Sequence, residues 1–242
     1  WSTNVMAIKK SNKLVPDNNI CIKGSVQLSS DKSLSIRSVL FASIAYGISH
    51  LKINDPGEDA LTSIMAIKKL GIKVTQIDNQ YTIYGLGIGY PSLKKRLLIN
   101  CRNSGTTLRL LTPLIAGSKI NAKIIGDHSL SKRPYRLEFL KEFLMNVKPT
   151  KKKFLPLMIN GHANCVQAEI KINKPSAQMV SAATLAGISS FGETIIECPN
   201  NVRDHTSRML KYLGYPIKTK NFRKKQTIKI LGKQFLQPIK NY

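Results

Sequence analysis

The sequence is poor in cysteine, in aromatic residues and in acidic residues. Its 242 residues include 4 Cys and 1 Trp, aromatic residues amount to 7%, and 13 Asp and Glu stand against 38 Lys and Arg. The cysteines form no CxxC pair and have no histidine at the spacing of a zinc site, which excludes a zinc finger. They are Cys21, Cys101, Cys165 and Cys198. Isolated cysteines of this kind are typical of reduced core thiols, so we expect a cytoplasmic protein.

Long hydrophobic runs are also missing. The apolar stretches are short and interrupted by polar residues, so we expect no membrane-spanning segment. The N-terminus lacks the apolar stretch and the small-residue cleavage site of a secretory signal. Hydrophobic residues still make up 42% of the chain, which is enough for a sizeable core and too many for a disordered protein.

The charge is strongly of one sign, with a formal net charge of +25. Most of the cations are lysines spread along the chain, a pattern that indicates solvated surfaces together with a site for small anions. Affinity for nucleic acid is the alternative. The few arginines are more informative, because a planar guanidinium fits carboxylate and phosphate groups.

An internal repeat organises the chain. A short β-branched run, a loop with a serine and an apolar helix rich in small residues occur three times, with the serines at Ser33, Ser104 and Ser176. A second strand, a second helix and a hairpin follow each time. The pattern predicts an α/β (α+β) lobe built from three βαβαββ repeats around buried helices. We place the units at 21–91, 92–164 and 165–235 of a lobe that covers 21–242, after a polar lead-in at 1–20.

Two segments carry the clearest helical signals. In DALTSIMAIKKLG, Leu61, Ile64, Met65 and Leu70 recur near helical spacing, which predicts an apolar face for the second helix of the first unit. The stretch SAATLAGISS is small and apolar on most sides, which predicts a helix buried among others.

The first loop of each unit lies where a strand ends and a helix begins, so that it presents backbone N–H groups to an anion. In the first unit, DKSLSIR supplies Lys32, Ser33 and Arg37, and the arginine lies about one helical turn after the serine. In the second unit, Gly105 of RNSGTTLR allows a ligand to approach the backbone closely, and Thr106 adds a hydroxyl.

The third unit and the second loops add further polar groups. Ser176 and Gln178 lie in KPSAQ, Arg133 in GDHSLSKRP, and Arg203 in NNVRDH. The equivalent loops of three units therefore carry hydroxyls, amides and cations together. Such a lining predicts a pocket for a substrate with at least one phosphate and a carboxylate.

Each of these residues also has a purely structural explanation. A serine at a strand-to-helix loop is more often a helix N-cap than a ligand, and Gly105 could serve turn geometry alone. Asp59, Asp127 and Asp204 lie near the starts of second helices, where they are natural caps and partners of the helix dipole. It is the agreement among the three units that favours a binding site.

At these residues the sequence resembles the 5-enolpyruvylshikimate-3-phosphate (EPSP) synthases, and in particular the N-terminal portion of a bacterial enzyme. The segments DKSLSIR, NSGTTLR, GDHSLSKRP, KPSAQMVSA and VRDHTSRML are similar to five motifs of that family, in the same order. The family fold has two similar lobes of three βαβαββ units each. In Ala177 and Arg203 the last two segments are similar to the class that includes glyphosate-tolerant bacterial enzymes.

The resemblance implies transfer of the enolpyruvyl group from phosphoenolpyruvate to the 5-hydroxyl of shikimate 3-phosphate, with release of phosphate. The reaction belongs to the shikimate pathway and implies no metal or organic cofactor. For shikimate 3-phosphate the implied ligands are Lys32, Ser33, Arg37, Ser176, Ala177, Gln178 and Arg203. For phosphoenolpyruvate they are Lys32, Gly105, Arg133 and Gln178, with Asn103 and Thr106 shaping the loop. Lys32, which is implied to touch both substrates, is the catalytic residue expected in this chain.

Two features depart from the family pattern. Ser29-Ser30 stands where the family usually has Pro-Gly, so we expect a different backbone in that loop. Family members are also much longer, and this chain begins with Trp1 rather than Met. We therefore expect one lobe, with residues 1–20 as a lead-in or as the start of the other lobe. The second lobe, which holds the acid/base carboxylates, is expected to be absent from this chain, and the chain alone to be inactive.

The resemblance further implies a monomer at full length, inhibition by glyphosate, and neither a membrane nor a specific nucleic-acid partner. The enolpyruvyl transferase that acts on UDP-N-acetylglucosamine shares the fold, but its Lys-Asn loop and its reactive-cysteine loop are not found here. The alternative from another class is a basic RNA-binding or RNA 3′-phosphate cyclase-like module. Its support is the charge, since the sequence has few aromatics and no stacking motif.

Overall fold

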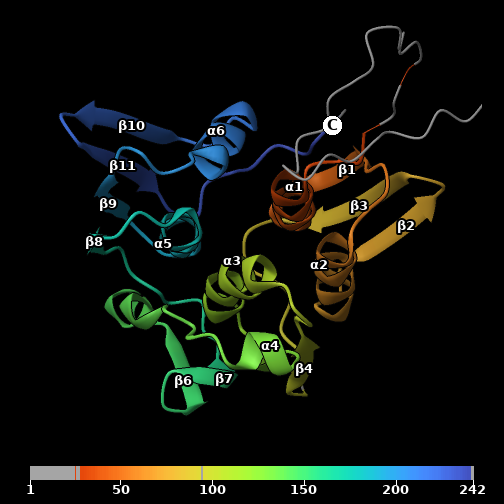
Figure 1. Cartoon of the computed structure of the whole chain (residues 1–242), viewed down its shortest axis with the longest axis horizontal. Coiled ribbons are helices and arrows are strands. Elements are labelled where there is room, and N and C mark those ends of the chain that lie inside the picture. The colour runs from red at the N-terminus through yellow and green to blue at the C-terminus, as the bar shows by residue number, and fades with distance from the viewer. Residues whose placement is uncertain (1–24, 26–27, 94, 241–242) are drawn as a thin grey trace, which may run out of the picture.

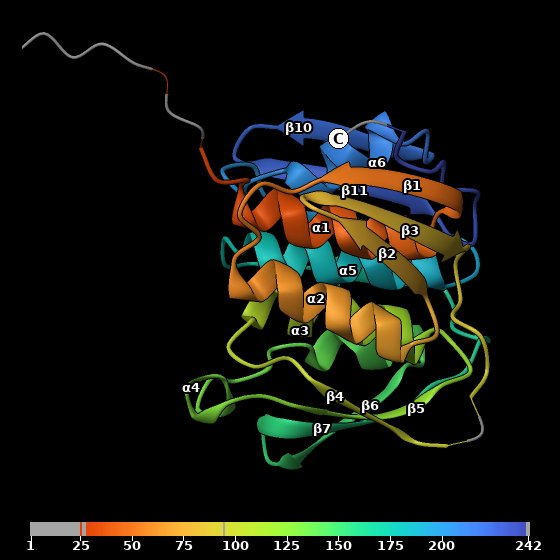
Figure 2. The ribbon, with the colours of Figure 1, turned by 90° about the vertical axis from the view of Figure 1, so that its right-hand side faces the viewer.

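The computed structural model describes residue 25, residues 28–93 and residues 95–240. Helices run side by side through the interior, and three β-sheets lie around them on the outside (Figures 1 and 2). The fold is therefore mixed α/β, as the sequence predicts. The predicted lead-in at 1–20 lies outside the described residues.

The first region of the chain forms two helices and an antiparallel sheet. Its elements are α1 (Lys32–Ile44), β1 (Tyr46–Lys52), α2 (Glu58–Lys69), β2 (Lys73–Ile77) and β3 (Gln80–Leu86). Strand β3 lies between β1 and β2 and pairs antiparallel with both. The strand predicted to open this unit falls almost wholly outside the described residues.

The second region contains a four-stranded sheet. Its elements are β4 (Leu97–Asn100), α3 (Gly105–Ala116), β5 (Asn121–Ile125), α4 (His128–Ser131), the 3₁₀ helix η1 (Glu138–Phe143), β6 (Asn146–Lys151) and β7 (Phe154–Asn160). The strand order is β4-β5-β7-β6, with β4 parallel to β5 and the other pairs antiparallel. A single second helix is predicted here, but the structure has two short helical pieces. Pro134 lies between them, and a proline cannot continue an α-helix that precedes it.

The third region has the same pairing pattern as the second. Its elements are β8 (Glu169–Lys171), α5 (Ala177–Ser189), β9 (Glu193–Pro199), α6 (His205–Tyr212), β10 (Ile217–Phe222) and β11 (Lys225–Leu231). The strand order is β10-β11-β9-β8, with β8 parallel to β9 and the other pairs antiparallel. In both regions, therefore, the strand before the first helix and the strand after it lie side by side.

Helices α1, α3 and α5 form the buried interior. The residues from Ser35 to Ile44 in α1 and from Val180 to Ser189 in α5 are all buried, which agrees with the prediction for SAATLAGISS. Small residues allow this packing. A Cβ atom at Gly187 would lie 2.8 Å from Cγ2 of Ile230, so glycine lets α5 lie close to β11.

The apolar face predicted for α2 is only partly correct. Ile64 and Leu70 are buried, but Leu61 and Met65 are exposed, and Ile67 is fully buried in their place. The buried face of α2 consists of Ala60, Thr62, Ser63, Ile64, Ala66 and Ile67. Helix α2 packs with this face of mostly small residues among α1, α3, β2 and β4, so the side that turns inward is rotated away from Leu61 and Met65.

The helix caps also follow the predictions in part. Ser104 caps α3 and Asp127 caps α4, each accepting a hydrogen bond from a backbone N–H of the first turn. Ser176 occupies the N-cap position of α5 without a side-chain hydrogen bond. Ser33 lies within α1, which is capped by Asp31 instead. The hydroxyl of Ser33 is therefore not needed as a cap.

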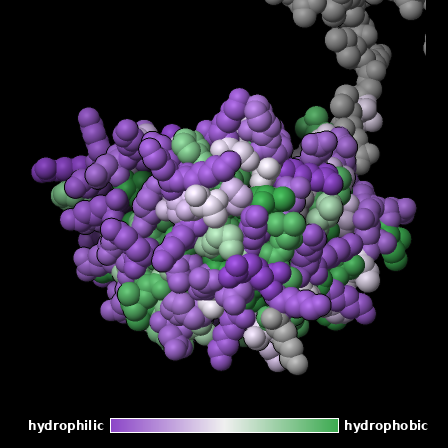
Figure 3. Space-filling view, turned by 90° about the horizontal axis from the view of Figure 1, so that it is seen from below, coloured by the Kyte–Doolittle hydropathy of each residue, from purple (hydrophilic) through white to green (hydrophobic). Residues whose placement is uncertain are grey.

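Three of the cysteines, Cys101, Cys165 and Cys198, are buried free thiols, as predicted, and Cys21 lies outside the described residues. None of the helices in the described part of the chain has the length and apolar composition needed to cross a membrane. The face of the molecule seen in Figure 3 is mostly hydrophilic, with hydrophobic side chains interspersed among the polar ones. This surface agrees with the strongly basic composition.

Candidate active site

The first turns of α1, α3 and α5 meet at one end of the helical interior, beside two adjoining cavities. The larger cavity has a volume of about 580 Å³ and the smaller one of about 350 Å³. Lys32, Thr106 and Gln178 line both of them, one residue from each helix. The two cavities therefore adjoin at these three residues, and together they form one hollow.

The larger cavity contains every residue that the resemblance implies for shikimate 3-phosphate. These are Lys32, Ser33, Arg37, Ser176, Ala177, Gln178 and Arg203. Asp31, Thr106, Pro175, Asn201, Val202 and His205 complete the lining. Because α1 and α5 both begin here, their free backbone N–H groups add to the polar character of the wall.

Arg37 is buried in the wall of the larger cavity, with 3% of its surface exposed. Its Nε donates to Oγ1 of Thr206 at 2.9 Å, and its Nη2 donates to Oγ of Ser181 at 3.0 Å. Its Nη1 donates to the carbonyl oxygen of Ser33 at 2.9 Å. Groups of α1, α5 and α6 therefore hold the guanidinium, which in turn fixes Ser33 at the edge of the cavity.

The smaller cavity contains every residue that the resemblance implies for phosphoenolpyruvate, namely Lys32, Gly105, Arg133 and Gln178. Asp59, Asn103, Thr106, Arg109, Pro134 and Arg136 complete its lining. Nη2 of Arg133 donates to Oδ1 of Asn103 at 2.9 Å and to Oγ of Ser129 at 2.8 Å. Asn103 therefore holds the arginine toward the loop that precedes α3.

Lys32 forms an ion pair with Asp59, which belongs to the first turn of α2. The expectation that Asp59 caps this helix is wrong, because Gly57 occupies the N-cap position and makes no side-chain hydrogen bond. The carboxylate instead orients the lysine at the boundary between the two cavities. Most of the Lys32 side chain remains exposed, so its ammonium is accessible to a ligand.

Cations outnumber carboxylates around the smaller cavity. Its charged lining consists of Lys32, Arg109, Arg133, Arg136 and Asp59. Burial, together with the like charges of Arg136 and Arg133, lowers the pKa of Arg109. Burial also lowers the pKa of Arg37 in the larger cavity. A bound anion would offset this repulsion, so the hollow is suited to anionic ligands.

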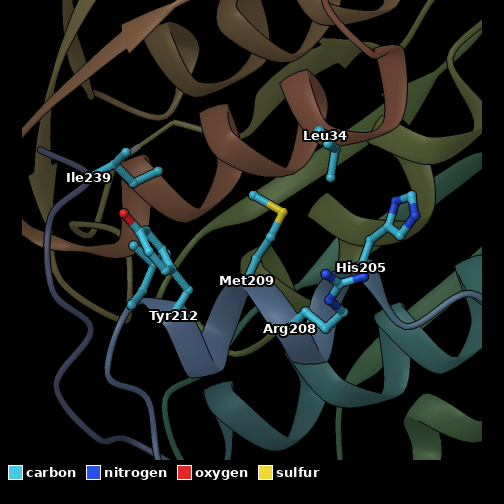
Figure 4. A pocket seen from close by; sticks show the side chains of 7 residues that line it. Leu34, His205, Arg208, Met209, Tyr212 and Ile239 are labelled. Atoms are coloured by element: carbon cyan, nitrogen blue, oxygen red, sulfur yellow. The ribbon is translucent and has the colours of Figure 1, made fainter. Parts of the chain in front are cut away.

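Another cavity, of about 450 Å³, lies between α1 and α6 (Figure 4). Leu34, Met209, Tyr212 and Ile239 give it a largely apolar lining, while His205 and Arg208 lie toward one end. Among the described residues its lining offers one arginine and one hydroxyl, that of Tyr212, and no side-chain amide, whereas a phosphorylated substrate needs several such groups together. The hollow at the helix starts is therefore the better candidate for the active site.

The sequence interpretation left some residues of the hollow unassigned, including Arg109, Arg136, Asn201 and His205. Arg109 had a detectable signal, because it lies one helical turn after Gly105 as Arg37 lies one turn after Ser33. Arg136 and Asn201 come from loops, and His205 begins α6, so their approach to the hollow depends on the fold.

Comparison with known proteins gives the same family as the motifs. The family model described as EPSP synthase (3-phosphoshikimate 1-carboxyvinyltransferase) matches residues 17–241. The 3-phosphoshikimate 1-carboxyvinyltransferase of Thermodesulfovibrio yellowstonii is 39% identical over 201 residues, which are 81% of this chain and 46% of that protein. The one of Bacillus cereus (strain B4264) is 34% identical over 230 residues, which are 94% and 52% of the two chains.

Solved structures agree with the sequence comparisons. A structure of EPSP synthase from Acinetobacter baumannii is similar with a TM-score of 0.80 and 32% sequence identity, covering 90% of this chain and 49% of that chain. The present chain thus spans about half the length of the relatives it matches. Its motifs, its fold and the family model together show that the chain belongs to the EPSP synthase family.

Proposed function

We propose that this chain supplies one half of the site at which the enolpyruvyl group of phosphoenolpyruvate is transferred to the 5-hydroxyl of shikimate 3-phosphate. The observation that carries the proposal is the pair of adjoining polar cavities that share Lys32, Thr106 and Gln178. Two anionic substrates bound side by side would have their reacting groups close together, as a transfer reaction requires. The reaction is a step of the shikimate pathway toward aromatic amino acids.

We assign shikimate 3-phosphate to the larger cavity. Ser176 and Ala177 offer a hydroxyl and the N–H groups at the start of α5, and Arg203 adds an exposed cation that can pair with an oxyanion. On the opposite wall, Arg37 keeps Ser33 in place at the start of α1. This set matches a substrate that carries a phosphate, a carboxylate and hydroxyls.

We assign phosphoenolpyruvate to the smaller cavity. Gly105 has no side chain, so an anion can approach the first N–H groups of α3, while Arg133 and Lys32 supply positive charge. Gln178 contributes an amide from α5. Glyphosate carries a phosphonate and a carboxylate, and we expect it to compete for the same cavity.

The proposed reaction proceeds by addition and elimination. The 5-hydroxyl gives up its proton to a base as its oxygen bonds to C2 of phosphoenolpyruvate, and C3 gains a proton from an acid. The intermediate then loses phosphate from C2 and a proton from C3, which restores the double bond. Lys32, at the boundary of the cavities, stabilises the anionic intermediate. Asp59 is paired with Lys32 and Asp31 caps α1, so we expect the acid/base groups in the part of the relatives that this chain does not match.

The test is a coupled assay of phosphate release with the 242-residue chain, alone and mixed with the separately expressed other half of the Bacillus cereus relative. We expect little or no turnover by the chain alone, turnover in the mixture, and none in a mixture with Lys32→Ala. Robust turnover by the chain alone would contradict the half-site. We further propose that the complete enzyme is cytoplasmic and monomeric. Sedimentation of the active mixture at the mass of one copy of each half would support the monomer.

A further inference from the structure

Arg109 occupies the second turn of α3 and is almost entirely buried behind the smaller cavity, with 8% of its surface exposed. Its Nη1 donates to the carbonyl oxygen of Gly105 at 3.1 Å and to Oε1 of Gln178 at 3.0 Å. Its Nη2 donates to the carbonyl oxygen of Pro134 at 2.9 Å. One guanidinium thus connects the start of α3, the start of α5 and the loop that carries Arg133.

The contact with Gln178 fixes which end of that side-chain amide faces the cavity. A guanidinium has only donors, so the amide must turn its carbonyl oxygen toward Arg109. The amide nitrogen then lies on the other side, where Nε2 donates to Oγ1 of Thr106 at 3.0 Å. Rotating the amide by half a turn would place donors of Gln178 against donors of Arg109 and leave buried donors unpaired.

We infer that Arg109 is a positioning residue that makes Gln178 present N–H donors, rather than its carbonyl oxygen, to the ligand of the smaller cavity. This inference rests on the proposed function for the identity of that ligand, phosphoenolpyruvate. The amide nitrogen carries two hydrogens, and Thr106 accepts one of them, so the other is left for an oxygen of the substrate. In the opposite orientation the carbonyl oxygen would repel a carboxylate or a phosphate.

The arrangement is also independent of pH. Although burial and neighbouring charges lower the pKa of Arg109, an arginine remains protonated in proteins, so its donors persist throughout the physiological range. Gln178 itself does not titrate. Arg109 therefore holds the neutral amide of Gln178 in one orientation at every physiological pH. A histidine in the same place would change its charge in this range.

The first test observes the Gln178 side chain directly in the ligand-free 242-residue chain by ¹⁵N NMR, with its amide signal identified from its loss in Gln178→Met. We expect hydrogen exchange of that amide to become at least about tenfold faster in Arg109→Met, because its orienting partner is lost. Arg136→Met removes a cation of the same cavity that has no hydrogen bond to Gln178 in the described part of the chain, and it should leave the exchange rate unchanged. Unchanged exchange in Arg109→Met would overturn the inference.

Arg109→Lys allows the same exchange measurement if the methionine variant fails to fold. A single ammonium cannot reach Gly105, Pro134 and Gln178 together, so we expect faster exchange in this variant as well, by about threefold or more. Exchange equal to that of the wild type would count against Arg109 as the orienting group.

The second test measures phosphoenolpyruvate dissociation constants in a double-mutant cycle. If Arg109 acts through Gln178, Arg109→Met and Gln178→Met should each weaken binding by about tenfold, and the double variant by little more than either. The fold-changes in dissociation constant caused by Arg136→Met and Gln178→Met should instead multiply in their double variant. If the fold-changes of Arg109→Met and Gln178→Met also multiply, the inference is overturned. If none of the proteins binds phosphoenolpyruvate, the proposed function fails, and the NMR experiment still decides the role of Arg109.

Discussion

Arg37 of α1 and Thr206 of α6 are joined by a hydrogen bond of 2.9 Å from Nε to Oγ1, although 169 residues separate them in the chain. The same guanidinium donates to Ser181 of α5 and to Ser33 of its own helix. One buried cation therefore connects the first and last helices behind the wall of the larger cavity. Its role in the fold can be separated from the role of the exposed arginine of the same cavity.

Arg37→Met should lower the stability of the chain. The substitution leaves the carbonyl and hydroxyl groups around Ser33, Ser181 and Thr206 without their donor, which costs about 1–3 kcal/mol of unfolding free energy. Urea denaturation measures the change. Arg203→Met is the matched control, because Arg203 is exposed and its loss should alter stability by less than about 0.5 kcal/mol. Equal losses in the two variants would contradict this division of roles.

Arg203→Ala should weaken binding of shikimate 3-phosphate by about tenfold or more. A charge-assisted hydrogen bond to a substrate oxyanion is worth about 1.5–3 kcal/mol, and no other arginine is exposed in this cavity among the residues that the structure describes. Lys151→Ala removes an exposed cation at the end of β6 that does not line the larger cavity, and should change the affinity little. Calorimetric titration of both variants is the measurement. Similar losses would point to a diffuse basic surface instead of a site.

Gly105→Ala, tested in an enzyme completed by a second lobe, should weaken inhibition by glyphosate more than it weakens use of phosphoenolpyruvate. The longer inhibitor needs more room beside α3, and steric exclusion discriminates by ligand length. The structure adds a second effect, because the new Cβ would lie 2.8 Å from Nη1 of Arg109 and must displace it. We therefore also expect a higher Michaelis constant for phosphoenolpyruvate. Identical inhibition constants for wild type and variant would place the inhibitor elsewhere.

The buried thiol of Cys101 should make the chain less stable at alkaline pH. Burial raises the pKa of Cys101 from 9.0 to about 12, so the folded state keeps a proton that the unfolded chain loses. The contribution is present in full below pH 9 and is lost as the pH rises from 9 to 12. Between pH 8 and pH 10 the unfolding free energy should therefore fall by about 1 kcal/mol more in the wild type than in Cys101→Ala. If urea denaturation gives equal falls in unfolding free energy for the wild type and Cys101→Ala, the raised pKa of Cys101 is contradicted.

Much of the fold was predictable because the signals are local. The small residues of SAATLAGISS predict a buried helix, and α5 is buried along its length after the first turn. The face of α2 was predicted less well, since Leu61 and Met65 lie at helical spacing yet are exposed. Spacing identifies apolar positions, but the elements packed around a helix decide which side turns inward, and in α2 that side includes small and polar residues such as Ala66 and Ser63.

The location of the candidate site was predictable because the motifs fall in equivalent loops. The structure brings the residues implied for both substrates to one hollow, and their roles in binding stay predictions. The contacts that orient them were not predictable, because they cross between distant loops. Asp59 was taken as a cap and instead pairs with Lys32, and the partners of Arg109 come from three separate segments.

The most direct test of the central claim is an NMR titration of the 242-residue chain with shikimate 3-phosphate at low and at moderate salt. We expect weak binding with signal changes confined to residues 31–37, 175–178 and 201–205, and largely preserved when salt is added, since one small phosphate in a polar cavity displaces few counterions. Changes spread over the lysine-rich surfaces that disappear with salt would contradict the account and favour a general polyanion-binding protein.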